Sequence, residues 1–222
     1  MEEFSQNKKP AYALTTAAII SAAAYVGVQM ISDLGSLQFV SVFGKALDGG
    51  TFIYPFSFTL RDVCQKVLGK RGVKVLIWTT AAINVLMAVS FWFISIFPIN
   101  FSAGGSKEWA EVLIPVWRIT IASIIAEVFS ELVDTEVYSW WVEKITTKKQ
   151  WARVLVSNIC SVPLDSFIFA FAAFYGTMPE TSVWQIFMGN VVIKLIVTLI
   201  SLPMIYIVKD SYLQPDFQKH DK

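Results

Sequence analysis

Acidic side chains interrupt two long apolar stretches of the sequence, both between residues 118 and 176. These acids include Glu127, Glu131, Asp134 and Asp165. A charge at the centre of a lipid bilayer costs roughly 2.5–3.5 kcal/mol even on the most permissive insertion scales. Acids in such stretches are therefore expected to face a protein interior or a cavity, and the sequence predicts a polar site between helices.

Helix spacing brings these residues onto common faces. Glu127, Glu131 and Asp134 follow the spacing i, i+4, i+7, so they stack on one face of a helix. A second polar face follows in the next stretch and is made of Asn158, Ser161 and Asp165. A short repeat of the form acid, hydroxyl, x, x, aromatic begins at Asp134 and again at Asp165. Such a repeat would place two acids on either side of one cavity, with a chance match as the alternative.

An internal ion pair is the alternative interpretation for each acid. The basic residues that could supply one are Arg118, Lys194 and Arg61. Ionisable groups inside a membrane mark functional sites by default, and these acids occur as a cluster, so we favour a binding site.

The two polar faces offer carboxylates, one carboxamide and hydroxyls, with many aromatic residues nearby. Carboxylates accept hydrogen bonds from N–H donors, and aromatic rings stack on flat ligands. Together they suit a planar heterocycle with adjacent N–H groups, such as a guanine-like edge, or a cationic amine. Each charge-assisted hydrogen bond would contribute roughly 1.5–3 kcal/mol in a dry pocket.

The elements that position these residues are membrane-spanning helices. Of 222 residues, 55% are hydrophobic and 16% are charged, and the mean hydropathy is +0.56. Apolar runs of about 18 or more residues recur along the chain, which is typical of helices that cross a bilayer. We expect an all-α integral membrane protein whose single domain covers residues 1–222. Its six transmembrane helices are expected at residues 12–31, 51–68, 73–99, 112–142, 154–175 and 183–208.

The first apolar run, from Ala11 to Ile31, is longer than the ~7–15 residues of a signal-peptide core, so we expect it to remain as the first span. The apolar stretch from Leu37 to Phe43 is too short to cross, and we expect it at the membrane interface.

The second expected span is apolar and aromatic in its first half and polar in its second. The first half contains Pro55, Phe58 and Thr59, and the second contains Arg61, Asp62, Gln65 and Lys66. A short span interrupted by proline and polar residues is what transporters use where the backbone lines a binding cavity. The alternative is a short helix whose charged end snorkels to the cytoplasm.

Basic residues set the expected orientation. Thirteen lie in the N-terminal segment, around the loops after the second and fourth spans, and in the C-terminal segment, whereas the opposite loops hold only Lys45 and Lys107. The positive-inside rule then places both termini in the cytoplasm.

The composition also excludes several classes. No basic patch interleaved with aromatic residues points to nucleic acid. Cys64 and Cys160 lack the spacing of a disulfide or a metal site, and the single histidine, His220, lies in the polar tail. We therefore expect no cofactor, no metal and no nucleic-acid partner.

Three pieces of the sequence form a recognisable pattern. They are Pro55-Phe-Ser-Phe58-Thr59-x-x-Asp62 followed by Gly69; Ser130-Glu131-x-x-Asp134; and Trp151-x-Arg153-x-x-x-Ser157-Asn158 leading to Asp165-Ser166-x-x-Phe169, Phe174 and Gly176. The pattern resembles the bacterial queuosine-precursor transporters, also called the vitamin-uptake-transporter family. The chain departs from that family after Asp62, where the family has Asn and Glu and this chain has Gln65 and Lys66, and at the added acid Glu127.

The resemblance implies a six-helix protein of the bacterial cytoplasmic (inner) membrane. Members import 7-deazaguanines such as 7-cyano- and 7-aminomethyl-7-deazaguanine, or queuine, and a deazaguanine carries the N1–H and 2-amino donors that a buried carboxylate would accept. The expected substrate-binding residues are Phe58, Thr59, Asp62, Glu127, Glu131, Asp134, Asn158, Ser161 and Asp165.

Two other functions fit parts of the pattern. A substrate-binding membrane subunit of a multi-component importer would need a separate energising partner. An intramembrane aspartyl-type enzyme could use Asp134 and Asp165, but the glycine-rich context of such enzymes is missing. We expect a transporter rather than an enzyme, with a 7-deazapurine and the lipid bilayer as partners, and a homo-oligomer is left open.

Overall fold

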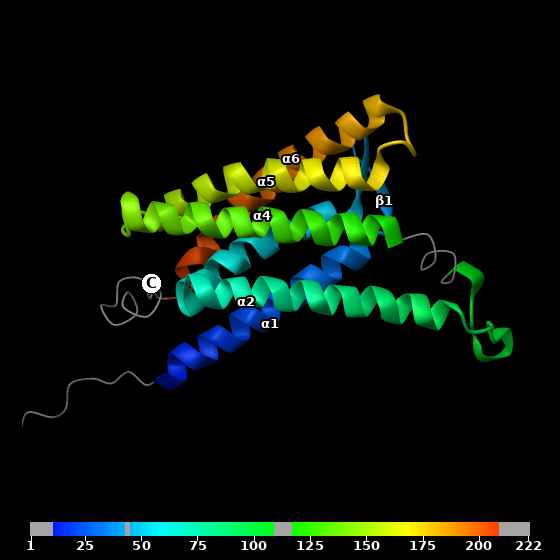
Figure 1. Ribbon diagram of the computed structural model, residues 1–222, viewed down its shortest axis with the longest axis horizontal. Coiled ribbons are helices and arrows are strands. Elements are labelled where there is room, and N and C mark those ends of the chain that lie inside the picture. Colours follow the sequence, from blue (N-terminus) through cyan, green and yellow to red (C-terminus); the bar gives the residue numbers. More distant parts are fainter. Residues whose placement is uncertain (1–10, 43–44, 109–116, 209–222) are drawn as a thin grey trace, which may run out of the picture.

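The computed structural model describes residues 11–42, 45–108 and 117–208. Within these residues, five long helices pack into an elongated bundle (Figure 1). They are α1 (Ala11–Gly35), α2 (Pro55–Ser95), α4 (Trp117–Lys144), α5 (Gln150–Phe174) and α6 (Glu180–Ser201). The short 3-10 helices are η1 (Gly49–Phe52), η2 (Phe101–Ala103) and η3 (Leu202–Tyr206).

A single residue divides α2 into two arms. Gly69 has φ 74° and ψ 177°, a backbone conformation that any side chain would strain. The chain reverses direction there, so residues 55–68 form a first arm and residues 70–95 form a second arm (Figure 1). The two arms take the places of the second and third expected spans.

The first arm is the centre of the bundle, and each of its residues is buried or half-buried. It contacts α1 through Cys64, α4 through Arg61, α5 through Asp62 and α6 through Thr59. At 1.5 Å per residue the arm reaches about 21 Å, less than the ~30 Å of bilayer hydrocarbon. Its charged side chains are buried in protein, so the snorkelling alternative for this segment is wrong.

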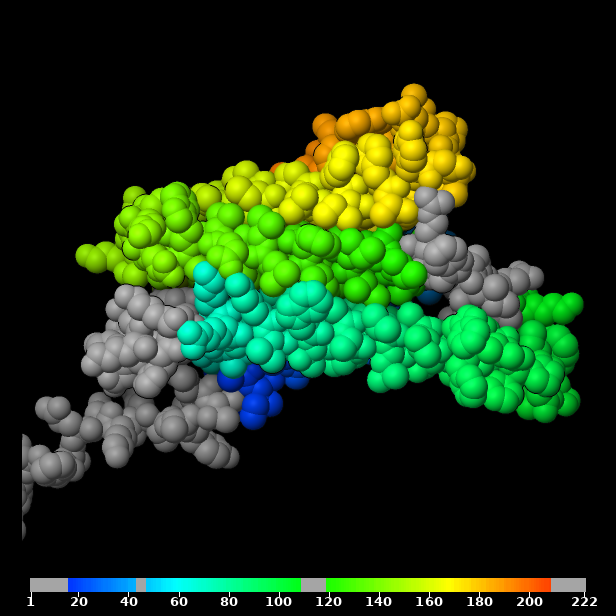
Figure 2. Space-filling view, viewed as in Figure 1, coloured from blue at the N-terminus to red at the C-terminus, as the bar shows by residue number. Residues whose placement is uncertain are grey.

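The second arm of α2 presents large apolar side chains to the outside. Figure 2 shows it beside α4 on one face of the molecule, and Val75, Trp78 and Leu86 are 59–67% exposed. A lipid environment accommodates such a surface. Four helices of the described chain, α1, α2, α5 and α6 with η3, are long and apolar enough to cross a membrane. The protein is therefore a multi-pass helical membrane protein.

A two-stranded hairpin departs from the all-helical expectation. β1 (Phe39–Val42) pairs antiparallel with β2 (Lys45–Asp48), so part of the stretch expected at the interface is a strand. Leu47 packs so closely on α6 that a Cβ at Gly189 would lie 2.7 Å from its Cδ2. The hairpin thereby carries Asp48 into the bundle.

The ends of the elements sort into two groups along the bundle. The start of α1, the Gly69 turn, the α4–α5 connection and η3 lie at one end, and the hairpin and the α5–α6 turn lie at the other (Figure 1). α2 begins at Pro55 rather than at residue 51, because a proline in the first helical turn has no hydrogen bond to lose. The cytoplasmic assignment of the first group stays a prediction.

Candidate substrate site

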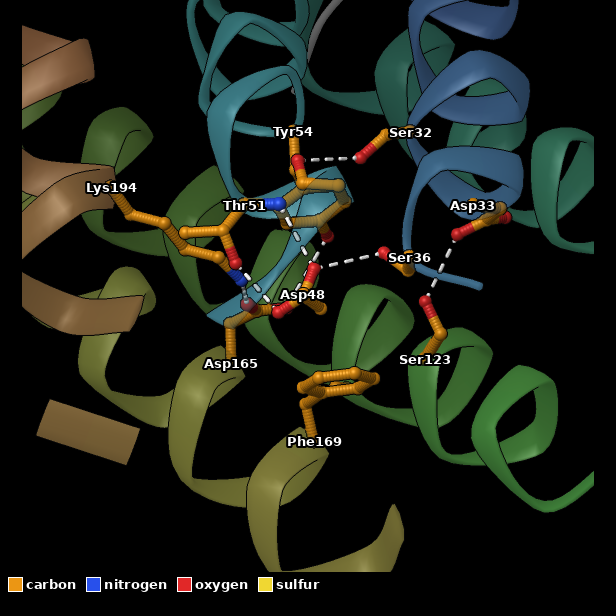
Figure 3. A pocket seen from close by; sticks show the side chains of 12 residues that line it. Ser32, Asp33, Ser36, Asp48, Thr51, Tyr54, Ser123, Asp165, Phe169 and Lys194 are labelled. Atoms are coloured by element: carbon orange, nitrogen blue, oxygen red, sulfur yellow. Dashed lines mark hydrogen bonds and ion pairs between the residues drawn. The ribbon is translucent and has the colours of Figure 1, made fainter. Parts of the chain in front are cut away.

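A small cavity lies between α1, η1, α4, α5 and α6 (Figure 3). Its polar and aromatic wall residues are Ser32, Asp33, Ser36, Asp48, Thr51, Tyr54, Ser123, Asp165, Phe169 and Lys194. The centres of water-sized molecules can occupy about 20 Å³ of it, which is room for roughly one or two ordered waters. The cavity therefore combines both charges, hydroxyls and two aromatic rings in very little space.

Asp48 fastens the hairpin and η1 to the helices around the cavity. Its carboxylate accepts hydrogen bonds from Thr51 N at 2.9 Å and Oγ1 at 2.6 Å, from Ser36 Oγ at 3.0 Å and from Asn190 Nδ2 at 3.1 Å. Gly50 is required beside it, because a Cβ there would lie 2.0 Å from Ser36 Oγ. With its oxygens occupied in this way, Asp48 builds the wall rather than offering a free binding group.

Asp165 forms an ion pair with Lys194 of α6 through Oδ2. Its other oxygen accepts from Tyr54 Oη and from Ser130 Oγ, each at 3.3 Å. The Lys194 ammonium also lies 4.5 Å from the centre of the Tyr54 ring, within cation–π range. Phe58 packs edge-on against that ring at 5.2 Å, which holds Tyr54 toward the cavity.

Asp33, near the end of α1, is the least saturated charge in the cavity wall. Ser123 Oγ donates to its Oδ1 at 3.0 Å, while its Oδ2 is buried and has no hydrogen-bond partner within the described residues. The residue as a whole is only 8% exposed. A buried carboxylate oxygen without a donor is rare in folded proteins, and it makes Asp33 the natural acceptor for a ligand.

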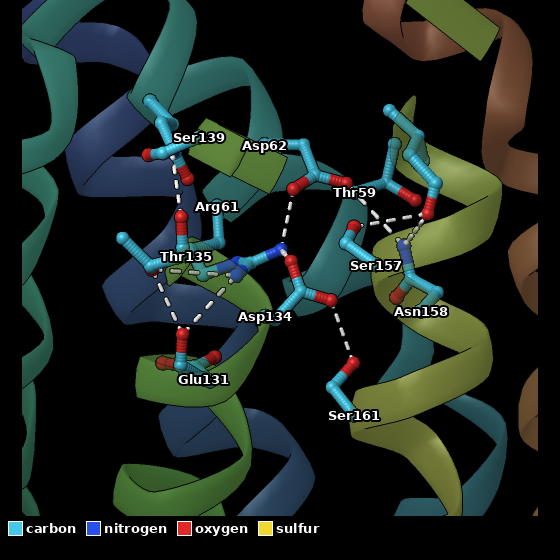
Figure 4. A network of polar contacts seen from close by, with 12 residues as sticks. Thr59, Arg61, Asp62, Glu131, Asp134, Thr135, Ser139, Ser157, Asn158 and Ser161 are labelled. Carbon is cyan, nitrogen blue, oxygen red and sulfur yellow. Dashed lines mark hydrogen bonds and ion pairs between the residues drawn. The ribbon is translucent and has the colours of Figure 1, made fainter. Parts of the chain in front are cut away.

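A second polar group surrounds the guanidinium of Arg61 (Figure 4). Arg61 forms ion pairs with Asp62 and Asp134. Ser161 Oγ donates to Asp134 at 2.6 Å, and Asn158 Nδ2 donates to Asp62 at 3.3 Å. This network joins the first arm of α2 to α4 and α5, with two carboxylates paired to one guanidinium.

A third group joins α1, α2 and α4 around two glutamates. Tyr25 Oη donates to Glu131, and Gln29 Nε2 lies 2.8 Å from Glu127 Oε1 and 3.0 Å from Glu131 Oε1. Asn84 Nδ2 donates to the other oxygen of Glu127 at 3.2 Å. Both glutamate side chains are fully buried.

The nine expected site residues are all buried, with exposed fractions of 0–2%, but they fall into separate groups. Asp165 lines the described cavity, and Phe58 supports its wall. Four belong to the Arg61 network: Asp62, Asp134, Asn158 and Ser161. Thr59 is hydrogen-bonded to Ser201 nearby. Glu127 and Glu131 belong to the third group. Substrate contact by these nine residues stays a prediction.

The ion-pair alternative holds for two of the acids. Asp134 pairs with Arg61, and Asp165 pairs with Lys194. Of these two acids, only Asp165 borders the described cavity, so the hypothesis that the repeat places both on one cavity is wrong for this cavity. Asp33 and Tyr54 were not expected as wall residues. For Asp33, one signal was available: the spacing of four residues that puts Gln29 and Asp33 on one face of α1.

A bundle of apolar helices around buried charges and a small polar cavity is the architecture of a membrane transporter for small molecules. The chain belongs to the family described as "Putative vitamin uptake transporter", which matches residues 48–208. It is a transporter and not an enzyme, and the family resemblance inferred from the sequence is confirmed.

The chain is also similar to a relative whose name gives a class of substrate. The "Probable queuosine precursor transporter" of Bacillus subtilis (strain 168) is 28% identical over 184 residues, which cover 80% of this chain and 78% of that protein. No solved structure matches the chain.

Proposed function

We propose that the chain imports 7-deazaguanine precursors of queuosine across the bacterial cytoplasmic membrane, and that the cavity between Asp33 and Asp165 is the substrate site. The substrates would be 7-cyano- and 7-aminomethyl-7-deazaguanine or queuine. The name of the Bacillus subtilis relative supports the substrate class. The main support for placing the substrate in this cavity is the Asp33 Oδ2 in its wall, which has no hydrogen-bond partner among the described residues.

The donor edge of a deazaguanine matches the Asp33 carboxylate, whose Oδ2 has no donor among the described residues. N1–H and the 2-amino group point in the same direction, and a carboxylate accepts two such donors in a parallel pair. The rings of Tyr54 and Phe169 in the cavity wall offer stacking surfaces (Figure 3). Each charge-assisted hydrogen bond would contribute roughly 1.5–3 kcal/mol.

Loading requires the cavity to open. The present space holds roughly one or two waters, and a purine-sized ring needs several times more. We expect α1 with η1 to separate from α5 with α6 during transport, as alternating access demands.

Thermal shifts of the purified protein test the substrate class, with guanine, the two deazaguanines and queuine as ligands. A ligand that binds only the folded state raises stability by ~2.7 kcal/mol at a hundredfold excess over its Kd.

Asp33→Asn presents a donor where the substrate needs an acceptor, so deazaguanine affinity should fall at least about tenfold. 7-Deazahypoxanthine lacks the 2-amino group, so the wild type should bind it more weakly than a deazaguanine. Asp33→Asn should also lower the affinity for 7-deazahypoxanthine by a smaller factor.

Glu136→Gln is the matched control. Glu136 is an exposed acid of α4 that pairs with Lys70 and Lys74, and its variant should keep wild-type affinity. Unchanged affinity of Asp33→Asn would remove Asp33 from the site, and no binding of any deazaguanine would reject the substrate class. Uptake that requires a second protein in the host cell would favour the binding-subunit alternative.

A further inference from the structure

We infer that Glu127 and Glu131 form a proton-binding site that couples import to the proton gradient. The inference depends on the proposed function for its substrate, but it concerns residues outside the described cavity wall.

Hydrogen donors and acceptors do not match in this group. Gln29 Nε2 carries two hydrogens but faces three oxygens, on Glu127 at 2.8 Å, Glu131 at 3.0 Å and Tyr25 at 3.2 Å. The side-chain carbonyl oxygens of Gln29 and Asn84, both on fully buried residues, have no donor among the described residues. The site is thus short of hydrogens at the point where two carboxylates meet two amides.

One proton on either glutamate reduces this mismatch by supplying one more donor. An ionised carboxylate only accepts, whereas a protonated carboxyl group also donates. Rotating the Gln29 or Asn84 amide by 180° turns its oxygen toward the acid, and the protonated acid can then donate to it. The two amides can therefore satisfy both the ionised and the protonated pair, which is what a site that loads and releases a proton requires.

The surrounding charges leave room for a proton rather than for a permanent ion pair. Within the described residues, no lysine or arginine lies within 4.0 Å of either carboxylate, and no cluster of three or more metal-ligating acids, histidines or cysteines occurs. Arg61 donates instead to the main-chain oxygen of Glu131 at 3.2 Å. The other titratable groups that act on the pair are Tyr25 and Asp33 of α1, Asp134 of α4 and Asp165 of α5.

Glu127 on α4 lies one helical turn from the cavity wall, and so does Gln29 on α1, which contacts both glutamates. Gln29 precedes Asp33 by four residues on α1, and Glu127 follows Ser123 by four residues on α4. Asp33 and Ser123 are themselves hydrogen-bonded at 3.0 Å. One turn of helix rises about 5.4 Å, so a charge gained or lost at the pair acts directly on the proposed substrate acceptor.

Transport in proteoliposomes tests the coupling. With a deazaguanine as substrate, the wild type should accumulate it when the outside is made acidic, and a protonophore should abolish accumulation. Glu127→Gln and Glu131→Gln fix the acid in a neutral form, so each variant should lose accumulation driven by the pH gradient, and any substrate exchange that it retains should no longer change with pH. A pH dye inside the vesicles should report proton entry with substrate in the wild type.

Glu136→Gln, an exposed acid on the same helix, should behave as the wild type in both assays. Wild-type accumulation that ignores the proton gradient or follows a sodium gradient would overturn the inference, as would undiminished accumulation by both variants. The dye signal in the wild type decides the matter if a variant does not fold. Absence of any exchange by the wild type would instead contradict the proposed substrate.

Discussion

Asp165 and Lys194 form a buried ion pair whose remaining hydrogen-bonding needs are largely met by neighbours. Tyr54 and Ser130 donate to the carboxylate, and the ammonium lies over the Tyr54 ring. A buried pair of this kind adds little net stability compared with apolar residues, but removing one partner strands the other charge. The pair therefore fixes the geometry of the cavity more than it stabilises the fold.

Asp165→Asn should lower the stability of the protein as well as uptake. Lys194, a residue only 5% exposed, would lose the carboxylate that pairs with its ammonium, and breaking such a pair costs about 3–5 kcal/mol. The double variant Asp165→Asn with Lys194→Gln removes both charges and should regain much of the melting temperature without regaining uptake. Melting curves and uptake at matched membrane levels check this, and a wild-type melting temperature for Asp165→Asn would contradict it.

Burial of the acids could be predicted from the sequence, because apolar neighbours on both sides of Glu127 and Asp165 leave a charge only the protein interior. Their partners could not be predicted. Whether Asp134 meets Arg61 or Lys194 depends on how helices distant in sequence are rotated against each other. Asp33 was missed because a charge near the end of a span is commonplace at a membrane surface.

Gly69 is the element-scale feature on which the bundle depends, because it lets the chain turn back without a loop. Its φ of 74° with ψ of 177° belongs to a region that is essentially restricted to glycine. The turn brings the first arm into the centre of the bundle while the second arm stays outside.

Gly69→Ala should destabilise the protein by about 1–3 kcal/mol, because the Cβ strains this backbone conformation. Gly27→Ala is the matched control: apart from the adjoining backbone of α1, a Cβ at this position meets no described atom within 4 Å, and alanine is the better helix former. Thermal melting of the two variants in one detergent compares them. Equal melting temperatures would show that the turn tolerates a side chain.

Most helices could be predicted from apolar run length, but two elements could not. The strand Phe39–Val42 is only four residues long, so the spacing of its apolar residues cannot distinguish a strand from a helix. The start of α2 at Pro55 was missed because the apolar run begins earlier, at η1, and hydropathy does not distinguish a 3-10 turn from the helix that follows.

At the scale of the whole molecule, the basic loops and the ends of the described chain lie together. The Gly69 turn and the α4–α5 connection, which carry much of the basic charge, lie at the same end of the bundle as the start of α1 and η3 (Figure 1). The positive-inside rule then favours one orientation for the bundle as a whole.

A tag at the C-terminus should therefore be reached by antibody only after the cells are permeabilised, whereas a tag inserted at Gly104, in an exposed turn, should be reached on intact spheroplasts. Labelling in the opposite pattern would reverse the assigned orientation.

The central position of the first arm has a consequence for biosynthesis. Residues 55–68 are too short and too polar to settle in lipid alone, and their partners on α4, α5 and α6 leave the ribosome later. The two arms of α2 must therefore be sheltered by the insertion machinery, or held at the membrane surface by the basic turn between them, until the later helices are made. The helix that organises the finished protein is thus among the last to find its place.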